Sequence, residues 1–297
     1  MTSPIVDPHQ HFWHLSLARH HWLIGPVRDR VFGDYSAIQR NYLLGDYLED
    51  TKNQNVVKSV HIEAEFDETE PVEETRWLQA HADKHGFPHG IVGNADLAAA
   101  DAGDVLDQHM QYGNFRGIRH TLCYDPDPRK SFSKHPDIIN SVEFRAGFQQ
   151  LENRALSFDL AAYYHQAEDS FQLAKRFANT QFIVNHAGFP LDKSAEGLIN
   201  WRAAMKRLAG APNIATKISG FGVSDPNWTL ESIRPLVLHL IDCFGIERCM
   251  FASNFPVDKL FKTYDEIFSC FKDIVNDFSA GDKKRLFHDN AVRLYKI

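Results

Sequence analysis

The chain has 297 residues, of which 43% are hydrophobic and 24% charged, a composition that allows a large buried core. Its 39 acidic and 32 basic residues give a formal net charge of −7, which argues against a nucleic-acid partner because such partners require a basic stripe. No apolar run long enough for a membrane span and no signal-peptide pattern is visible, and the four cysteines form no C-x-x-C pair. We therefore expect a cytoplasmic protein without disulfides.

Strand-like and helix-like segments alternate along the chain. The predicted strands, each rich in Val, Ile, Phe or Ala, are residues 5–7, 56–64, 90–96, 115–122, 156–163, 182–186, 214–219 and 249–253. The predicted helices, each with an apolar stripe of helical period, are residues 71–86, 101–112, 141–153, 167–178, 197–209, 230–244 and 264–276. Eight strand–helix units predict a single-domain (β/α)8 TIM barrel over residues 1–297. An open doubly wound sheet is the alternative, but no G-x-G-x-x-G turn follows the first strand.

Two long segments interrupt this alternation. Residues 14–45 follow the first strand and are rich in aromatic and basic side chains, and residues 124–136 follow the fourth strand and are rich in Pro and Asp. Long loops in a compact domain are usually functional, and the aromatic content argues against disorder. We expect both loops at the C-terminal mouth of the barrel, where enzymes of this fold have their sites.

Three histidines follow predicted strands. His9 and His11 are two residues apart, so strand alternation lets both rings point into one cavity. By itself such a pair is also compatible with two solvated loop residues. His186 ends a mid-barrel strand and Asn254 follows the last one. Because all strand ends meet at the same mouth, we expect one site there, suited to a metal ion or to an oxyanion.

These motifs carry a family resemblance. The opening Asp7-Pro8-His9-Gln10-His11-Phe12-Trp13, the segment Asn185-His186-Ala187-Gly188 and the end Ser253-Asn254-Phe255-Pro256 resemble the amidohydrolase superfamily. Phe115-Arg116-Gly117-Ile118-Arg119-His120 and Glu73-Glu74-Thr75-Arg76-Trp77-Leu78 are similar to its amidohydrolase 2 branch, which includes fuconolactonase-like, rhamnonolactonase-like and dicarboxylate-lactone hydrolases. The resemblance covers nearly the whole chain and implies a barrel that acts on a small molecule.

One position departs from the family pattern. The family usually ends its eighth strand with an aspartate, the expected general base or metal ligand, whereas this chain has Asn254. An amide does not accept a proton at neutral pH. Asp258, four residues on, is the nearest replacement if the segment curls into a helix; a helix cap or a surface acid is its alternative role.

The metal site that the resemblance implies is also incomplete. No bridging carboxylate or modified lysine follows the fourth strand, so we expect zero or one metal ion. A single Zn²⁺ would be held by His9, His11 and His186. Without a metal, these histidines and Arg119 would polarise the substrate directly.

Further side chains at strand ends are candidates for substrate binding. They are Trp13, Glu63, Glu65, Arg119, His120, Tyr163, His165 and Lys217. Trp13 is either a pocket wall or the anchor of its own loop, and the two glutamates form either substrate contacts or an edge ion pair. Arg119 suits a carboxylate, but the resemblance favours His120 as the inward-facing member of that pair.

The sequence therefore predicts a hydrolase that opens a small lactone derived from a sugar acid or a dicarboxylate. Two alternatives remain: a zinc-dependent decarboxylase of an unsaturated or aromatic acid, and a degenerate barrel that binds a ligand without efficient catalysis. The sequence does not fix the oligomeric state, and a homo-oligomer is compatible with it.

Overall fold

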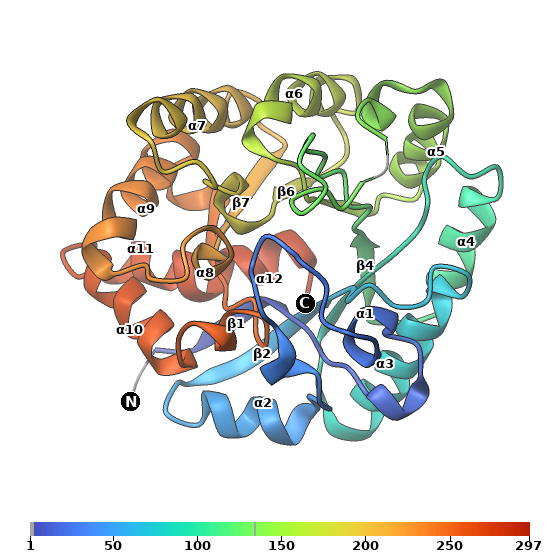
Figure 1. Ribbon diagram of the computed structural model, residues 1–297, viewed down its shortest axis with the longest axis horizontal. Helices are drawn as coiled ribbons and strands as arrows, with labels where there is room; N and C mark the ends of the chain where they lie inside the picture. The colour runs from blue at the N-terminus through green and yellow to red at the C-terminus, as the bar shows by residue number, and fades with distance from the viewer. Residues whose placement is uncertain (1–2, 134) are drawn as a thin grey trace.

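Eight short parallel strands form one sheet in which each strand pairs with the next along the chain. The computed structural model describes residues 3–133 and 135–297. The strands are β1 (Ile5–Gln10), β2 (Val56–Ile62), β3 (Gly90–Gly93), β4 (Phe115–Ile118), β5 (Ser157–Leu160), β6 (Phe182–Val184), β7 (Ile214–Ile218) and β8 (Cys249–Phe251). The helices surround them, so the predicted TIM barrel is confirmed (Figure 1). The sequential strand order excludes the doubly wound alternative, which reverses its order partway.

The barrel closes between β1 and the segment that follows β8. Gln10 and Phe255 form a parallel bridge there. The amide of Asn254 donates to the carbonyl of His9 over 2.8 Å, and the amide of His11 donates to the carbonyl of Phe255 over 2.7 Å. The hydrogen bonds that close the barrel therefore also fix the backbone of three predicted site residues.

The inside of the barrel is apolar at the N-terminal end of the strands. Val6, Val60, Ile183 and Met250 pack there against α12 (Asn290–Tyr295), which lies across this end. Strands that are buried on both faces need apolar side chains at successive positions, which explains why they were recognisable in the sequence. This packed end leaves the opposite end, the carboxyl ends of the strands, for a pocket.

The outer helices lie close to their predicted bounds. They are α3 (Pro71–His85), α4 (Ala102–His109), α5 (Val142–Asn153), α6 (Ala167–Arg176), α7 (Ala195–Ala209), α9 (Leu230–Phe244) and α10 (Tyr264–Ile274). Side chains of Ser141, Ser194, Thr229 and Thr263 cap α5, α7, α9 and α10 by accepting a backbone N–H of the first turn. Five further α-helices lie outside the predicted ranges. They are α1 (His21–Ile24), α2 (Leu44–Thr51), α8 (Phe221–Ser224), α11 (Ala280–Lys284) and α12.

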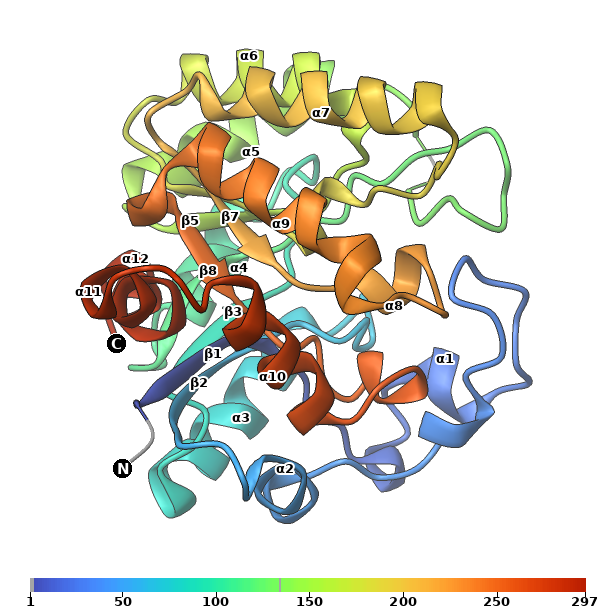
Figure 2. The same cartoon turned by 90° about the vertical axis from the view of Figure 1, so that its left-hand side faces the viewer.

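The two long loops lie together at the mouth. Figure 2 shows both on the side of the barrel opposite the chain termini. The first contains α1 and is ordered by aromatic packing, with Trp22 and Tyr35 buried and their ring centroids 5.4 Å apart. Lys134, in the second loop, lies outside the described residues. Among the described helices, none has the length and apolarity to cross a membrane.

Candidate active site

A pocket of about 680 Å³, its open mouth included, lies at the carboxyl ends of the strands. Six of the predicted site residues line it: His11, Trp13, Glu65, Arg119, His186 and Asn254. They follow or end β1, β2, β4, β6 and β8, so the expected convergence of strand ends occurs. His9, Glu63, Lys217 and Asp258 are buried just behind this lining.

Three imidazole rings lie together at the base of the pocket: His11 and His186 line it, and His9 is buried directly behind them. The ring centroid of His9 lies 5.0 Å from that of His11 and 4.4 Å from that of His186. His186 has a positive φ of 50° in a tight turn after β6, and Gly220 packs so closely that a Cβ there would lie 2.6 Å from the ring of His186. We call these three side chains the histidine floor.

Each ring of the histidine floor is held through Nδ1. His11 Nδ1 donates to the Ile62 carbonyl over 2.8 Å, His186 Nδ1 lies 3.1 Å from Ser219 Oγ, and His9 Nδ1 lies 3.4 Å from Lys217 Nζ. Burial lowers the pKa of His11 to about 3, and Arg119 adds to this effect. Burial likewise lowers the pKa of His9 and of His186 well below the ordinary value. All three rings are therefore neutral at pH 7, and Nε2 of His11 carries a lone pair.

The residue types of the histidine floor suit one zinc ion. His11, whose Nδ1 donates to a backbone carbonyl, presents its Nε2 lone pair as zinc-binding imidazoles do, and His9 Nε2 is buried without a hydrogen-bond partner among the described residues. The floor contains no carboxylate, which a second metal ion would need. Across residues 3–133 and 135–297, no three His, Cys, Asp or Glu side chains already surround a common point at coordination distance.

Asn254 connects the floor to a buried acid. Its Oδ1 lies 3.2 Å from His11 Nε2, and its Nδ2 donates to Asp258 Oδ2 over 2.6 Å. The other carboxyl oxygen of Asp258 accepts the Gly222 amide over 3.0 Å. Burial raises the pKa of Asp258 to about 7. The segment does curl, as the sequence allowed, but it leaves Asp258 behind Asn254, so the carboxyl does not line the pocket.

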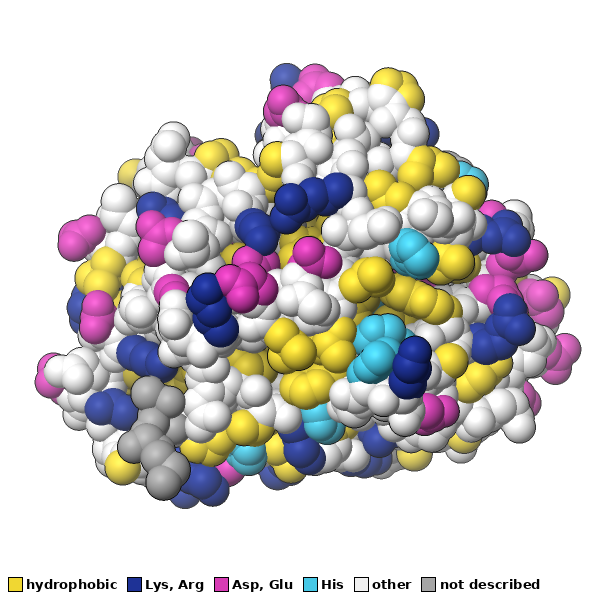
Figure 3. Space-filling model, turned by 90° about the horizontal axis from the view of Figure 1, so that it is seen from below, with side chains coloured by type: hydrophobic (Ala, Val, Ile, Leu, Met, Phe, Trp, Pro, Cys, Tyr) yellow, Lys and Arg dark blue, Asp and Glu magenta, His cyan; other side chains and the backbone are white. Residues whose placement is uncertain are grey.

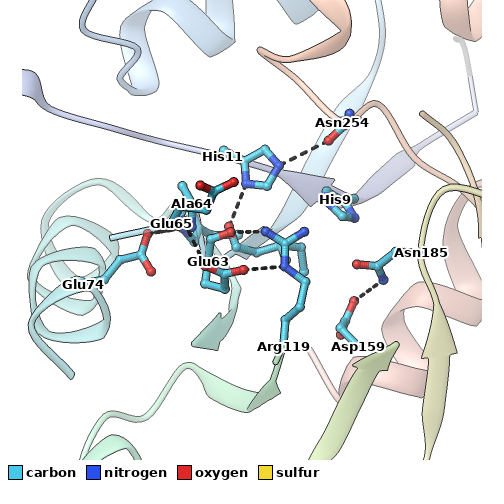
Figure 4. A network of polar contacts seen from close by, with 12 residues as sticks. His9, His11, Glu63, Ala64, Glu65, Glu74, Arg119, Asp159, Asn185 and Asn254 are labelled. Carbon is cyan, nitrogen blue, oxygen red and sulfur yellow. Dashed lines mark hydrogen bonds and ion pairs between the residues drawn. The ribbon is translucent and has the colours of Figure 1, made fainter. Parts of the chain in front are cut away.

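Arg119 is the charged group on the β4 side of the pocket. Its Nε donates to Glu63 Oε1 over 2.6 Å and its Nη2 to the Glu63 carbonyl (Figure 4). Burial alone would lower the pKa of Arg119, but the Glu63 carboxylate reverses this and raises it. The guanidinium is thus charged, is neutralised by Glu63, and keeps Nη1 free of partners among the described side chains.

A second buried layer lies beneath His9. Lys217 Nζ forms an ion pair with Asp159, and both side chains are inaccessible to solvent. Asp159 also accepts Tyr295 Oη over 2.9 Å and Asn185 Nδ2 over 2.9 Å. Burial lowers the pKa of Lys217 to about 8, although Asp159 opposes the shift. Lys217, a predicted substrate ligand, therefore supports His9 from below and has no contact with the pocket.

Sequence reasoning missed several supporting residues. Asp159 and Tyr295 were overlooked, as was the role of Asp7, whose carboxylate accepts the hydroxyl of Ser253 over 2.6 Å, that of Tyr47 over 3.0 Å and a backbone amide at His9. The available signal was an aspartate inside an otherwise apolar strand, which Asp7 and Asp159 share. A buried carboxylate needs several donors, and these acids provide the strand ends with fixed anchors.

Three further predicted residues also lie outside the pocket lining. The ring of His120 packs edge-on against Phe144, 5.5 Å between centroids, and its Nδ1 accepts the Leu97 amide. The resemblance favoured His120 over Arg119, but neighbouring side chains alternate, and the structure directs Arg119 inward. Tyr163 donates to the Lys130 carbonyl, and His165 Nε2 bonds the Tyr124 carbonyl over 2.9 Å. Both hold the second long loop.

Comparison with known proteins identifies the family of the chain. The model of the Amidohydrolase family Amidohydro_2 matches residues 6–297. The chain is 51% identical to the uncharacterized protein y4mH of Sinorhizobium fredii over 99% of this chain and 98% of that one. It is 26% identical to an L-fucono-1,5-lactonase of Burkholderia multivorans, over 98% and 96% of the two chains.

A solved structure is also similar. An amidohydrolase of Burkholderia multivorans, crystallised with bound zinc, superposes with a TM-score of 0.83 at 25% identity, covering 99% of this chain and all of that one. With the family match over nearly the entire sequence and the strand-end histidines at one mouth, the chain belongs to the Amidohydro_2 family of amidohydrolases.

Proposed function

We propose that this protein hydrolyses a small lactone at the histidine floor. The observation that carries the proposal is the pair formed by His11 Nε2 and Asn254 Oδ1, 3.2 Å apart and both at the pocket surface. His11 donates through Nδ1 to Ile62, so its Nε2 is an acceptor, as is the amide oxygen. Two adjacent acceptors do not bond each other, but together they bind the two O–H groups of one water molecule.

This water is the nucleophile of the proposed reaction. Its oxygen adds to the ring carbonyl while its proton passes to His11 Nε2, the general base. The ring C–O bond then breaks, the alkoxide oxygen takes the proton from His11, and a hydroxy acid leaves. Asp258 does not touch the water; it holds Asn254 Nδ2 and so keeps the amide oxygen directed toward the pocket.

Two groups are available for the developing oxyanion. Arg119 Nη1 is unpaired among the described side chains and carries positive charge. Ser219 Oγ can donate to His186 Nδ1, which leaves the proton on Nε2 and makes that atom a donor. Donors fixed before the reaction begins stabilise an oxyanion at low cost in reorganisation.

A zinc ion held by His9, His11 and His186 would polarise the carbonyl and acidify water. The zinc-containing relative supports this possibility for the site, and its lactonase relatives support ring opening. In that case Asn254 Oδ1 still orients the water, and Asp258 still orients Asn254. Asn254 and Asp258 therefore have the same role with one zinc ion and without metal, whereas His11 Nε2 is free to act as the base only without it.

A lactone panel tests the proposal. Purified protein is analysed for zinc, then assayed for acid release with and without added zinc and after chelation. Turnover of at least one lactone that His11→Ala abolishes is expected. Release of carbon dioxide from an aromatic acid instead would favour a decarboxylase. Activity that appears only in Asn254→Asp would favour a degenerate barrel, whereas activity that falls in this variant assigns Asn254 to the mechanism.

A further inference from the structure

Five aromatic side chains form the sides of the pocket above the histidine floor. They are Trp13, Trp22, Phe32, Phe132 and Phe189, and we call them the aromatic wall. Trp22 and Phe32 belong to the first long loop and Phe132 to the second, so both loops contribute to it. The wall contacts the floor, since the ring centroid of Trp13 lies 6.4 Å from that of His11 and that of Phe189 lies 5.1 Å from that of His186.

The polar atoms of this wall are already bonded to the protein. Trp13 Nε1 donates to the Arg40 carbonyl over 2.8 Å, and Trp22 Nε1 donates to the Ala64 carbonyl over 2.9 Å. Both indoles therefore offer only carbon to a ligand. The remaining lining from Cys123, Val223 and Val257 is also apolar.

The charges at the pocket are paired as well. Glu65 accepts both terminal nitrogens of Arg30, over 2.7 and 2.8 Å, and Glu63 neutralises Arg119. A ligand with two carboxylates would find no second unpaired cation in the described lining. A ligand with several hydroxyl groups would find few acceptors outside the water-binding pair His11 and Asn254.

We infer, resting on the proposed lactone hydrolysis, that the substrate is a lactone whose ring bears an aromatic or alkyl group, not a polyhydroxylated sugar lactone. The aromatic wall takes the apolar group, and Thr121, a polar side chain of the same lining, takes one further oxygen, since Arg119 Nη1 serves the oxyanion. A hydroxyl group that is buried without a partner loses its hydrogen bonds to water, so several of them disfavour a sugar ring at this wall. Ring opening is the same balanced step as above: water adds across the acyl C–O bond and yields a hydroxy acid.

The decisive experiment compares two six-membered lactones of opposite character, dihydrocoumarin and D-glucono-1,5-lactone. Spontaneous hydrolysis is subtracted from each rate. We expect kcat/KM for dihydrocoumarin to be at least ~100-fold higher, the discrimination that a few unpaired hydroxyls produce. Equal values, or preference for the sugar lactone, would overturn the inference while leaving lactone hydrolysis intact.

If no lactone is cleaved, a binding experiment tests the apolar substrate class separately from lactone hydrolysis. Chroman and 1,5-anhydro-D-glucitol are cyclic ethers that match the two lactones but lack the carbonyl. Calorimetric binding of chroman with no heat from the glucitol would sustain the apolar substrate class even where ring opening fails. Binding of the glucitol, or of neither ether, would sink it.

A substitution in the wall, with a matched control elsewhere, tests whether the preference arises there. Phe132→Ser introduces a hydroxyl into the wall, and Phe278→Ser makes the same change at a half-buried phenylalanine that does not line the pocket. Phe132→Ser should reduce the preference for dihydrocoumarin about tenfold, with Phe278→Ser unchanged. Equal effects of both substitutions would mean that the preference does not arise at the wall.

Discussion

The histidine floor and the aromatic wall border the same pocket but are built in opposite ways. The floor is made of polar side chains on strand ends, and each ring is fixed by a buried partner such as Ile62 or Ser219. The wall is made of apolar side chains, most of them on loops, that hold one another by ring packing, as Trp13 and Trp22 do at 5.6 Å between centroids. Chemistry therefore depends on single hydrogen bonds, whereas ligand preference depends on summed contacts. Single substitutions should therefore have larger effects in the floor than in the wall.

The largest effect is expected at the floor. His11→Ala removes the proposed base, and positioned bases contribute ~10²–10⁴-fold to rate, so kcat should fall about 10³-fold. Steady-state kinetics on the best lactone measures it. His85→Ala on α3 is the control, because that ring is exposed; Figure 3 shows that histidines also occur on the outer surface. Less than a tenfold loss in His11→Ala would exclude His11 as the base.

The second-largest effect is expected on stability, from substitutions in the buried layer under the floor. Lys217→Met leaves the Asp159 carboxylate without its cation in a site inaccessible to solvent. Breaking such a pair costs ~3–5 kcal/mol, which urea unfolding would detect. Lys206→Met at an exposed position of α7 serves as the control.

A double variant checks the physical reason for that loss. Asp159→Asn combined with Lys217→Met removes both charges while Asn185 and Tyr295 remain to bond the amide. It should recover part of the free energy of unfolding. If the double variant is as unstable as the sum of the single ones, the pair is not coupled.

This contrast also explains what the sequence could predict. Strand positions and the residues that end them, including His9, His186 and Asn254, follow from apolar periodicity and the shared mouth of a barrel. Asn254 replaces the family aspartate, so Asp258 was recognised as the nearest acid. Its position behind the amide was not predictable, because it depends on a left-handed φ of 60° at Asn254.

For the aromatic wall, the sequence predicted only that aromatic residues are frequent in the first long loop. The first long loop is aromatic, but which of its rings face the pocket depends on distant backbone partners such as the Ala64 carbonyl that holds Trp22. Strand alternation likewise could not decide between Arg119 and His120. Glu63, which follows β2 two strands away in the sheet, fixes that choice by pairing with Arg119. Contacts between elements, unlike periodicity within one, leave no local pattern in the sequence.

The Asn254 side chain, which lies between Asp258 and His11, predicts that activity depends on pH, with an effect of intermediate size. Burial raises the pKa of Asp258 to about 7. When ionised, the carboxylate accepts Asn254 Nδ2; when protonated, it donates and turns the amide oxygen away from the pocket. Activity should therefore rise with pH through about 7, by ~10–100-fold. Because the acid has a raised pKa in the folded state, the free energy of unfolding should fall as pH rises from about 4 to 7.

Asp258→Asn tests the assignment of both effects. An asparagine at 258 has one acceptor oxygen where Asp258 uses two, for Gly222 and for Asn254. The variant should keep the low-pH activity at every pH and lose the stability slope. Asp277→Asn, at an exposed position, should retain both profiles. If activity of Asp258→Asn still rises through about pH 7, the rise belongs to another titrating group.

The smallest effect is expected where the wall meets solvent. The Arg30 guanidinium lies 5.2 Å from the ring centroid of Trp22 and 5.3 Å from that of Phe132, and it pairs with Glu65. It thereby joins the two long loops without lining the pocket itself. Partly exposed ion pairs and cation–π contacts each contribute ~0.5–1 kcal/mol, so Arg30→Met should raise KM about fivefold and leave kcat unchanged. Arg129→Met, which breaks only the local pair with Asp127, is the matched control. A fall in kcat as large as the rise in KM would mean that the loops also position the floor, and that the two regions are not energetically separate.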